Sequence, residues 1–258
     1  MKVTVCQLNN KPDLFLNDWE MLKAHVQYEK SDLVLLPEMP FSEWFAARPE
    51  FDNEKWQTAI EAHDGWMKRL HELKCPYVLG TRPVNDGEKR YNKAFIWNET
   101  NGIFELHQKH NVPDQKEYWE ASWYDIGSKD YTTILCGEVR IGFVICTEIW
   151  FMEYSRSYCK QGAHIIVNPR ATKVITRDKW LAAGRVSAMI GGAYNLSSNR
   201  TGEDTQNKTI QFGGQGWIID PEGNVLGVTT DKNPFITQEI NLKFAEESKK
   251  TYPRYVPD

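Results

Sequence analysis

Short apolar segments of strand length alternate with segments of helical period along nearly the whole chain, and this pattern limits the possible folds. Hairpin signals interrupt the alternation at Asn101-Gly102, at Gly137-Glu138 and at residues 221–224. Strict alternation would build one parallel sheet, whereas inserted hairpins add antiparallel strands. The sequence therefore predicts an α/β fold, with α+β character, in which helices cover mixed sheets.

The spacing of apolar residues predicts the individual elements. Strands are expected at 3–7, 32–36, 77–80, 93–97, 103–107, 131–136, 139–145, 164–168, 193–198, 216–220, 225–229 and 235–241. Helices are expected at 14–30, 56–73, 151–161 and 178–190. The first helix is expected to bury Leu16, Trp19, Leu22 and Val26.

Composition excludes several classes of protein. The 258 residues, 41% of them hydrophobic, suffice for one large core, and without a linker-like tract we expect a single domain over 1–258. The net charge of −4 and the scattered Lys and Arg argue against a nucleic-acid partner. With no apolar run long enough for a membrane span and no signal peptide, a cytoplasmic protein is expected.

The five cysteines are expected to be free thiols, because they form no CxxC pair and their number is odd. Cys6 and Cys136 lie in apolar strand patterns and are expected to be buried, whereas Cys159 lies in a predicted helix that could expose it. No histidine pairs with Cys or Asp at ligand spacing. We expect neither a metal nor a cofactor.

Cys146 ends the apolar run Gly142-Phe143-Val144-Ile145, and polar Thr147 and Glu148 follow it. A thiol at a strand end lies at the edge of the core, where neighbouring groups can activate it and a substrate can reach it. Glu38 and Lys109 also follow predicted strands. Sites in α/β sheets gather beyond the carboxyl ends of strands, so these residues form a candidate site.

A carboxylate can accept the thiol proton, and an ammonium group can stabilise an oxyanion. Each residue also has a structural interpretation: Glu38 as a helix cap, Lys109 as a surface lysine and Cys146 as a buried thiol. Their shared position at strand ends supports the catalytic interpretation, and from these residues alone both interpretations stay open.

The segments around these residues resemble a known family. Leu36-Pro37-Glu38 is similar to the glutamate motif of the nitrilase superfamily of carbon–nitrogen hydrolases, 107–113 to its lysine motif and 142–148 to its cysteine motif. The order of the motifs and their wide spacing also match. The resemblance extends from about residue 1 to 241, including 168–172 and 198–202.

The resemblance implies a four-layer αββα sandwich, paired into a homodimer or a higher homo-oligomer, and a Glu–Lys–Cys triad. Glu38 would be the general base, Cys146 the nucleophile, and Lys109 with the backbone N–H of Thr147 the oxyanion stabilisers. Many members have a second glutamate that positions substrate and water. Glu120 is preferred for it over Glu117, because 120–127 resembles the family segment that carries this residue.

The residues after the cysteine bear on the substrate. Nitrilases proper usually carry Trp where Thr147 stands in this chain, which favours an amidase. N-carbamoyl-amino-acid hydrolases tend to carry Arg at the positions of Ile149 and Trp150. These two are expected to form an apolar wall for an uncharged or aliphatic acyl group. Asn111 stands where the family commonly has His, which weakens any role for a histidine.

Other substrate-binding candidates follow the motifs. Arg170 and Thr172 follow a predicted strand and are expected to rim the pocket, where Arg170 either meets an acidic substrate or forms a surface salt bridge. Trp44 and Trp119 follow the glutamate and lysine motifs and are expected to line a small pocket, although core packing explains them almost as well.

The sequence thus predicts a cysteine-dependent hydrolase that cleaves the non-peptide C–N bond of a small linear amide. The products would be a carboxylic acid and ammonia or an amine, formed through a thioester. A nitrilase or an N-carbamoyl amine hydrolase with the same triad are alternatives, as is a catalytically idle binding homologue. A papain-like Cys–His enzyme is disfavoured, because no histidine has a suitable partner in the sequence.

Overall fold

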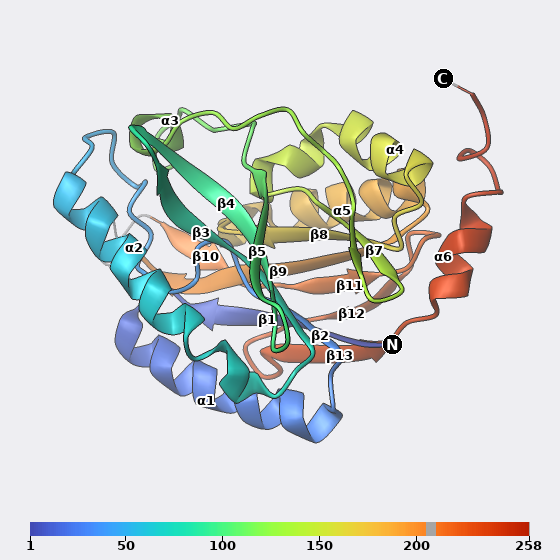
Figure 1. Cartoon of the computed structure of the whole chain (residues 1–258), viewed down its shortest axis with the longest axis horizontal. Helices are drawn as coiled ribbons and strands as arrows, with labels where there is room; N and C mark the ends of the chain where they lie inside the picture. The colour runs from blue at the N-terminus through green and yellow to red at the C-terminus, as the bar shows by residue number, and fades with distance from the viewer. Residues whose placement is uncertain (205–209, 258) are drawn as a thin grey trace.

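Two sheets packed face to face form the centre of the structure, a computed structural model that describes residues 1–204 and 210–257 (Figure 1). The strands are β1 (Lys2–Asn9), β2 (Leu33–Leu35), β3 (Tyr77–Asp86), β4 (Lys89–Asn98), β5 (Gly102–Gln108), β6 (Ile134–Cys136), β7 (Val139–Phe143), β8 (Ile165–Arg170), β9 (Tyr194–Glu203), β10 (Gln211–Gly213), β11 (Trp217–Ile219), β12 (Val225–Val228) and β13 (Phe235–Glu239). The helices are α1 (Pro12–Glu29), α2 (Asn53–Met67), α3 (Glu120–Trp123), α4 (Met152–Lys160), α5 (Arg177–Gly191) and α6 (Leu242–Ser248), with 3-10 turns η1 (Leu70–Leu73), η2 (Cys146–Trp150) and η3 (Val174–Thr176).

The strand order is β5-β4-β3-β2-β1-β9-β8-β7-β6, with β13 beside β1, β10 and β11 beside β9, and β12 beside β11. The sheets are mixed, as predicted: β1 is parallel to β2 and β9, whereas β3, β4 and β5 form antiparallel hairpins. β1 joins the two sheets, because its last residues, Gln7 to Asn9, pair with Asn199 to Thr201 of β9.

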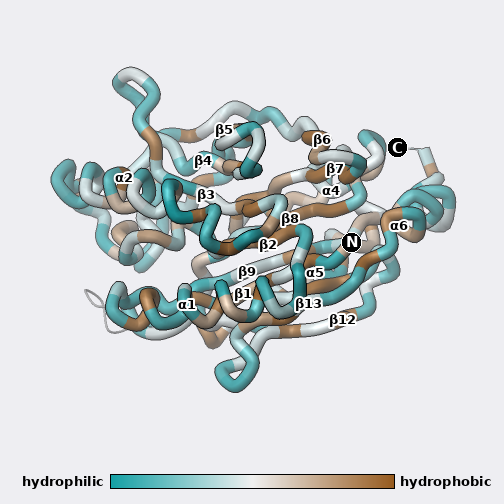
Figure 2. Tube along the Cα trace, turned by 60° about the horizontal axis from the view of Figure 1, so that its bottom comes forward, coloured by the Kyte–Doolittle hydropathy of each residue, from teal (hydrophilic) through white to brown (hydrophobic). Residues whose placement is uncertain are grey.

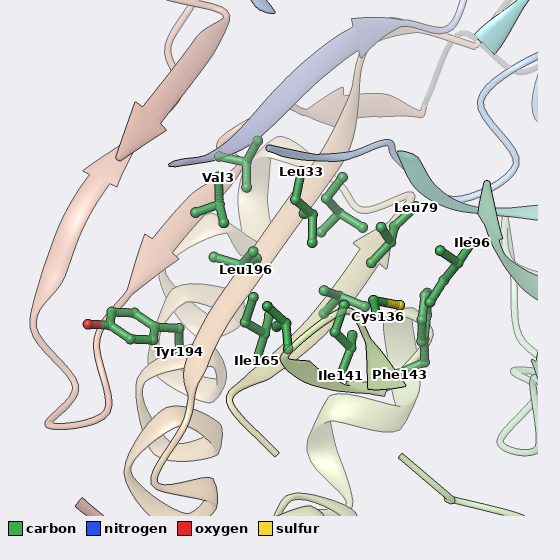
Figure 3. Packing of buried hydrophobic residues seen from close by; sticks show 14 of the residues in the cluster. Val3, Leu33, Leu79, Ile96, Cys136, Ile141, Phe143, Ile165, Tyr194 and Leu196 are labelled. Carbon is green, nitrogen blue, oxygen red and sulfur yellow. The ribbon is translucent and has the colours of Figure 1, made fainter. Parts of the chain in front are cut away.

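Apolar side chains between the two sheets form the main core. Val3, Leu33 and Leu79 on one side face Ile141 and Ile165 on the other (Figure 3). α1 and η1 pack against the outer face of the first sheet, and α4 and α5 against the outer face of the second (Figure 1). These four layers, helix, sheet, sheet and helix, are the predicted αββα sandwich.

α1 shows how side-chain spacing selects the buried face. Phe15, Trp19, Leu22 and Val26 are buried at helical intervals. The prediction of Leu16 in this set was wrong: it is 51% exposed, and Phe15 takes the inner position one residue earlier. Figure 2 shows the result, with α1 hydrophilic over much of its length and central strands such as β2 and β8 mostly hydrophobic.

Other elements differ from the prediction in length. β3 continues to Asp86 and forms a hairpin with β4 around Gly87, because its second half, residues 82–86, pairs with residues 89–93 of β4. The helix expected over 56–73 ends at Met67, and η1 follows it. α6 was not predicted. Cys159, for which exposure was open, is 6% exposed, and all five cysteines are free and buried.

Among the described residues, no helix has both the length and the apolar character that a membrane crossing requires.

Candidate active site

Three strands that run in the same direction place Glu38, Lys109 and Cys146 at one end of the two sheets. β7, β8, β9, β1, β2 and β3 are successively parallel, and two antiparallel pairings turn β5 back into the same direction. Glu38 follows β2, Lys109 follows β5 directly, and Cys146 opens η2 after β7. The shared position inferred from the sequence is thus present in the fold.

The loop after β2 holds Glu38 through backbone contacts. Met39 has a φ of 43°, so the chain turns sharply behind the glutamate. The buried guanidinium group of Arg200 donates to the carbonyl oxygens of Glu38 (3.0 Å), Met39 and Ser42 (2.8 Å). Arg200 from β9 therefore fixes the backbone from which the Glu38 side chain projects.

Cys146 lies at a strained turn between β7 and η2. Its φ of 47° is in the left-handed region, which a residue with a side chain rarely adopts. The side-chain amide of Asn168 donates to the carbonyl oxygens of Val144 (2.6 Å) and Cys146 (3.1 Å) and holds this turn. Gly142, before the turn, abuts the ring of Tyr158, which leaves no room for a side chain there.

Lys109 lies between two carboxylates. Its Nζ is 2.7 Å from Oε1 of Glu38 and 2.5 Å from Oε2 of Glu120, and all three side chains are buried. Asn92 donates to Oε1 of Glu38 at 2.8 Å, and the Tyr124 hydroxyl donates to Oε2 of Glu120. Oε2 of Glu38 and Oε1 of Glu120 are buried and have no hydrogen-bond partner among the described residues. Each carboxylate thus keeps one oxygen for another group.

Burial and charge set the protonation states of this cluster. Burial alone would lower the pKa of Lys109, but Glu120 and Glu38 hold that pKa above its usual value, so the ammonium form persists. Burial raises the pKa of Glu120 to about 8, against the opposing effect of Lys109 and with a further contribution from Glu38.

The Cys146 thiol is protonated at neutral pH in this environment. Burial raises its pKa, Glu38 raises it further, and Lys109 opposes both. A protonated thiol is a weak nucleophile, so attack requires a base that takes the proton in the same step. Glu38, whose charge acts on this thiol, keeps one carboxylate oxygen without a partner among the described residues.

Cys146 opens into a pocket of about 280 Å³. The pocket is lined by Pro113, Gln115, Lys116, Tyr118, Glu120, Cys146, Thr147, Ala171, Thr172, Lys173, Ile175, Thr176 and Trp180. A thiol, a carboxylate and several hydrogen-bonding side chains thus share one small cavity, as in small-molecule sites.

Of the predicted substrate-binding residues, Thr147 and Thr172 line this pocket, and the others do not. Arg170 was expected on the rim, but it is completely buried: it donates to Ser197, Thr172 and the Gln215 carbonyl, and it stacks on Trp217 at 3.9 Å. Through its hydrogen bond to Thr172, Arg170 supports the loop that follows β8.

The tryptophans also lie elsewhere. Trp44 is buried in a cluster with Phe45 and Phe212. Trp119 is half-buried and its backbone N–H donates to the Ala46 carbonyl oxygen. Neither tryptophan lines the pocket, and Trp44 has the packing role that the sequence left open as its alternative.

The predicted apolar wall after the cysteine is absent from the pocket lining. Ile149 is buried in the cluster that α4 and α5 cover, because η2 turns its side chain away from the cavity. Trp150 is 44% exposed and touches Trp180 edge to face, with ring centroids 5.2 Å apart. Of this aromatic pair, Trp180 is the pocket residue, so the inference of an uncharged acyl group loses its basis.

The two candidate glutamates occupy different positions. Glu120 lines the pocket and contacts Lys109, whereas Glu117 lies outside the pocket lining and contacts the lining residue Lys173. Glu117 is 9% exposed rather than the solvated loop residue expected in the structural interpretation. The geometry therefore favours Glu120 as the second glutamate.

Sequence reasoning missed four polar residues at the site. Asn92 and Tyr124 contact the two glutamates, and Glu148 contacts the lysine segment. Tyr118 lines the pocket, and its buried hydroxyl has no partner among the described residues. Of the four, only Glu148 could have been found from the sequence, because it is an acidic residue inside the apolar segment 142–151. The other three reach the site through contacts between distant segments, which no local pattern indicates.

No group of three His, Cys, Asp or Glu side chains is placed to hold a metal ion within residues 1–204 and 210–257.

The chain matches the family model described as carbon-nitrogen hydrolase over residues 2–250. It is 28% identical over 233 residues to nitrilase homolog 2 of Dictyostelium discoideum, covering 80% of this chain and 68% of that protein. It is 24% identical over 225 residues to the 2-oxoglutaramate amidase of Bacillus subtilis, covering 86% and 83%.

A solved carbon-nitrogen hydrolase from Helicobacter pylori G27 superposes with a TM-score of 0.87 at 20% identity, covering 98% of this chain and 94% of that one. This likeness shows the fold, and the family match spans the segments that hold Glu38, Lys109 and Cys146. The chain belongs to the carbon-nitrogen hydrolase family, within the nitrilase superfamily.

Proposed function

We propose that the protein hydrolyses a small linear amide to a carboxylic acid and ammonia or an amine, through a thioester on Cys146. The observation that carries this proposal is the buried cluster of Lys109, Glu38 and Glu120 beside the pocket thiol. A buried lysine between two carboxylates is costly to maintain for stability alone, and such groups concentrate at catalytic sites.

In the first half-reaction, Sγ of Cys146 attacks the amide carbon while Glu38 takes the thiol proton. The negative charge forms on the substrate oxygen, where the Lys109 ammonium group and the Thr147 backbone N–H stabilise it. The C–N bond then breaks, the amine leaves with the proton from Glu38, and the acyl group stays on sulfur. Water attacks the thioester carbon and gives up a proton to a carboxylate of the cluster. The C–S bond then breaks, the carboxylic acid leaves, and the sulfur of Cys146 takes that proton back, which restores the thiol.

Glu120 and Tyr118 are proposed to position the substrate. Glu120 has one unpaired oxygen and the Tyr118 hydroxyl is unpaired among the described residues, and both residues line the cavity. An amide presents an N–H donor and a carbonyl acceptor, so it can satisfy the carboxylate and the hydroxyl together.

Two lysines in the pocket lining favour an acyl group that carries a negative charge remote from the amide. Lys116 and Lys173 both line the cavity, and burial together with the charge of Lys116 lowers the pKa of Lys173. Glu117 pairs with Lys173, so it balances only one of the two positive charges. An additional anion, such as a substrate carboxylate, would therefore bind favourably beside them. 2-Oxoglutaramate, the substrate named for a relative, is itself an amide with a distal carboxylate.

Lys173→Met is expected to lower kcat/KM about tenfold for an amide with a distal carboxylate, because a charge-assisted hydrogen bond is lost. For the neutral amide of matched length, kcat/KM is expected to stay within about twofold. Ammonia release with the two substrates measures the difference. Lys179→Met, which removes a cation outside the pocket lining, is the control. Equal losses with both substrates would argue against the carboxylate subsite.

A panel of linear amides, a nitrile and an N-carbamoyl amine tests the reaction class by ammonia release. We expect turnover of at least one linear amide and a lower kcat/KM for the nitrile and the carbamoyl compound. Turnover of the nitrile alone, or of the carbamoyl amine alone, would replace the proposal with the corresponding alternative.

A further inference from the structure

Glu148 is a completely buried carboxylate outside the Lys109 cluster that accepts four hydrogen bonds. Its Oε2 accepts from His107 Nε2 and from the Ile145 backbone N–H, each at 2.7 Å. Its Oε1 accepts from the His110 backbone N–H at 2.6 Å and from the Tyr131 hydroxyl at 3.0 Å. The proposed mechanism does not use this carboxylate, so its role requires a separate explanation.

His107 is the charged partner of Glu148. Its Nε2 faces the Glu148 carboxylate and its Nδ1 faces the Asp130 carbonyl oxygen at 2.9 Å. Both partners are acceptors only, so both ring nitrogens donate and the ring is an imidazolium. Although burial alone would lower the pKa of His107, Glu148 raises that pKa overall, in agreement with this geometry.

The partners of Glu148 flank the reacting residues on both sides. His107 and His110 lie two residues before and one residue after Lys109, and Ile145 immediately precedes Cys146. β5 leads to Lys109 and β7 leads to Cys146. In the strand order these two strands are separated by β4, β3, β2, β1, β9 and β8. No strand pairing between β5 and β7 therefore sets the spacing of the lysine and the thiol, whereas Glu148 contacts both segments directly.

The charge of His107 also matters for the neighbouring cluster. Glu148 is one of the charges that raise the pKa of Glu120, after burial and Glu38, with Lys109 acting in the opposite direction. The imidazolium lies next to the Glu148 carboxylate and offsets its negative charge, so the effect of Glu148 on Glu120 is reduced.

We propose that Glu148 and His107 are positioning residues that hold Lys109 and Cys146 at the separation required for formation of the thioester. The proposal rests on the proposed function, in which Cys146 is the nucleophile. Displacement of a reacting group by about 1 Å can cost about a hundredfold in rate. Loss of the contact between Glu148 and His107 should therefore lower kcat more than it raises KM.

His107→Leu and His107→Gln separate this role from general packing. Leucine removes both donors, whereas glutamine keeps one donor for Glu148. We expect kcat to fall about a hundredfold in His107→Leu and about tenfold in His107→Gln, with KM within about threefold of wild type in both. Glu148→Gln, which puts an amide N–H₂ against surrounding donors, should lower kcat at least as far as His107→Leu.

The matched control is His164→Leu, because His164 also contacts a glutamate, Glu246 at 3.3 Å, away from the pocket. Its kcat is expected to equal that of wild type. Thermal unfolding of each variant identifies any that does not fold, and if His107→Leu is one of them, His107→Gln decides the question.

A folded His107→Leu, or in its absence His107→Gln, with kcat within twofold of wild type would overturn the proposal. So would a loss confined to KM. Cys146→Ala measured in parallel keeps the two proposals distinct: activity that survives there refutes the nucleophile, whereas an unaffected His107 variant with an inactive Cys146→Ala refutes only the positioning role.

Discussion

Replacing Cys146 by alanine is expected to lower kcat by at least about a thousandfold for every amide that the protein hydrolyses. The variant keeps the pocket and the cluster around Lys109 but cannot form a thioester. Ammonia release under saturating substrate measures the effect. Cys146→Ser should be nearly as inactive, because a hydroxyl in this environment is a poorer nucleophile than a thiol.

Cys159→Ala is the matched control, since Cys159 is also a buried free thiol but lies in α4, outside the pocket lining. Its activity should remain close to that of wild type. Substantial turnover by Cys146→Ala, with loss of activity in Cys159→Ala, would move the nucleophile to the other cysteine and refute the proposed role of Cys146.

Replacing Lys109 by methionine is expected to abolish activity and to destabilise the fold by about 3–5 kcal/mol. Both effects have one cause: Glu38 and Glu120 lose the cation that pairs with each of them in the interior. Chemical denaturation at pH 7 measures the loss of stability, and ammonia release measures the loss of activity.

The stability deficit of Lys109→Met should grow as pH rises above about 8. Burial already raises the folded-state pKa of Glu120 to about 8, and loss of Lys109 raises this pKa further. Below that pH both folded proteins hold the Glu120 proton, which the unfolded chain releases above its ordinary glutamate pKa, so the free energy of unfolding falls with pH in both alike. Above about pH 8 the wild type releases this proton and the variant keeps it, so the free energy of unfolding continues to fall only in the variant.

Lys23→Met is the control for this variant, because Lys23 also contacts two carboxylates, Glu20 at 2.9 Å and Glu72 at 3.1 Å, but at the surface. Exposed ion pairs contribute only about 0–1 kcal/mol, so this change should have little effect on stability. Equal destabilisation by the two substitutions, or normal kcat in Lys109→Met, would contradict the role of the buried cluster.

The sequence was sufficient to predict the layers of the fold and the positions of Glu38, Lys109 and Cys146. Local patterns indicated mixed sheets covered by helices and placed each of the three residues after an apolar strand. The four-layer arrangement came from the resemblance to the nitrilase superfamily. α6 was missed because its short, charged sequence has little apolar periodicity.

The pocket lining was harder to predict, because proximity to a motif does not fix the direction of a side chain. Arg170 is the last residue of β8 at the site, yet its guanidinium group turns inward onto Trp217. Tyr118 carries no motif of its own, yet it lines the cavity. The link between Glu148 and His107 joins segments 41 residues apart, and no local pattern encodes such a contact.

Intact-protein mass spectrometry during turnover of an amide tests the central claim most directly. Rapid acid quenching should reveal a protein species heavier by the acyl group of the substrate, and peptide mapping should locate that group on Cys146. The same experiment on Cys146→Ala should show no adduct. An acyl group on another cysteine, or steady turnover with no adduct on any cysteine in quenched samples, would contradict the thioester mechanism.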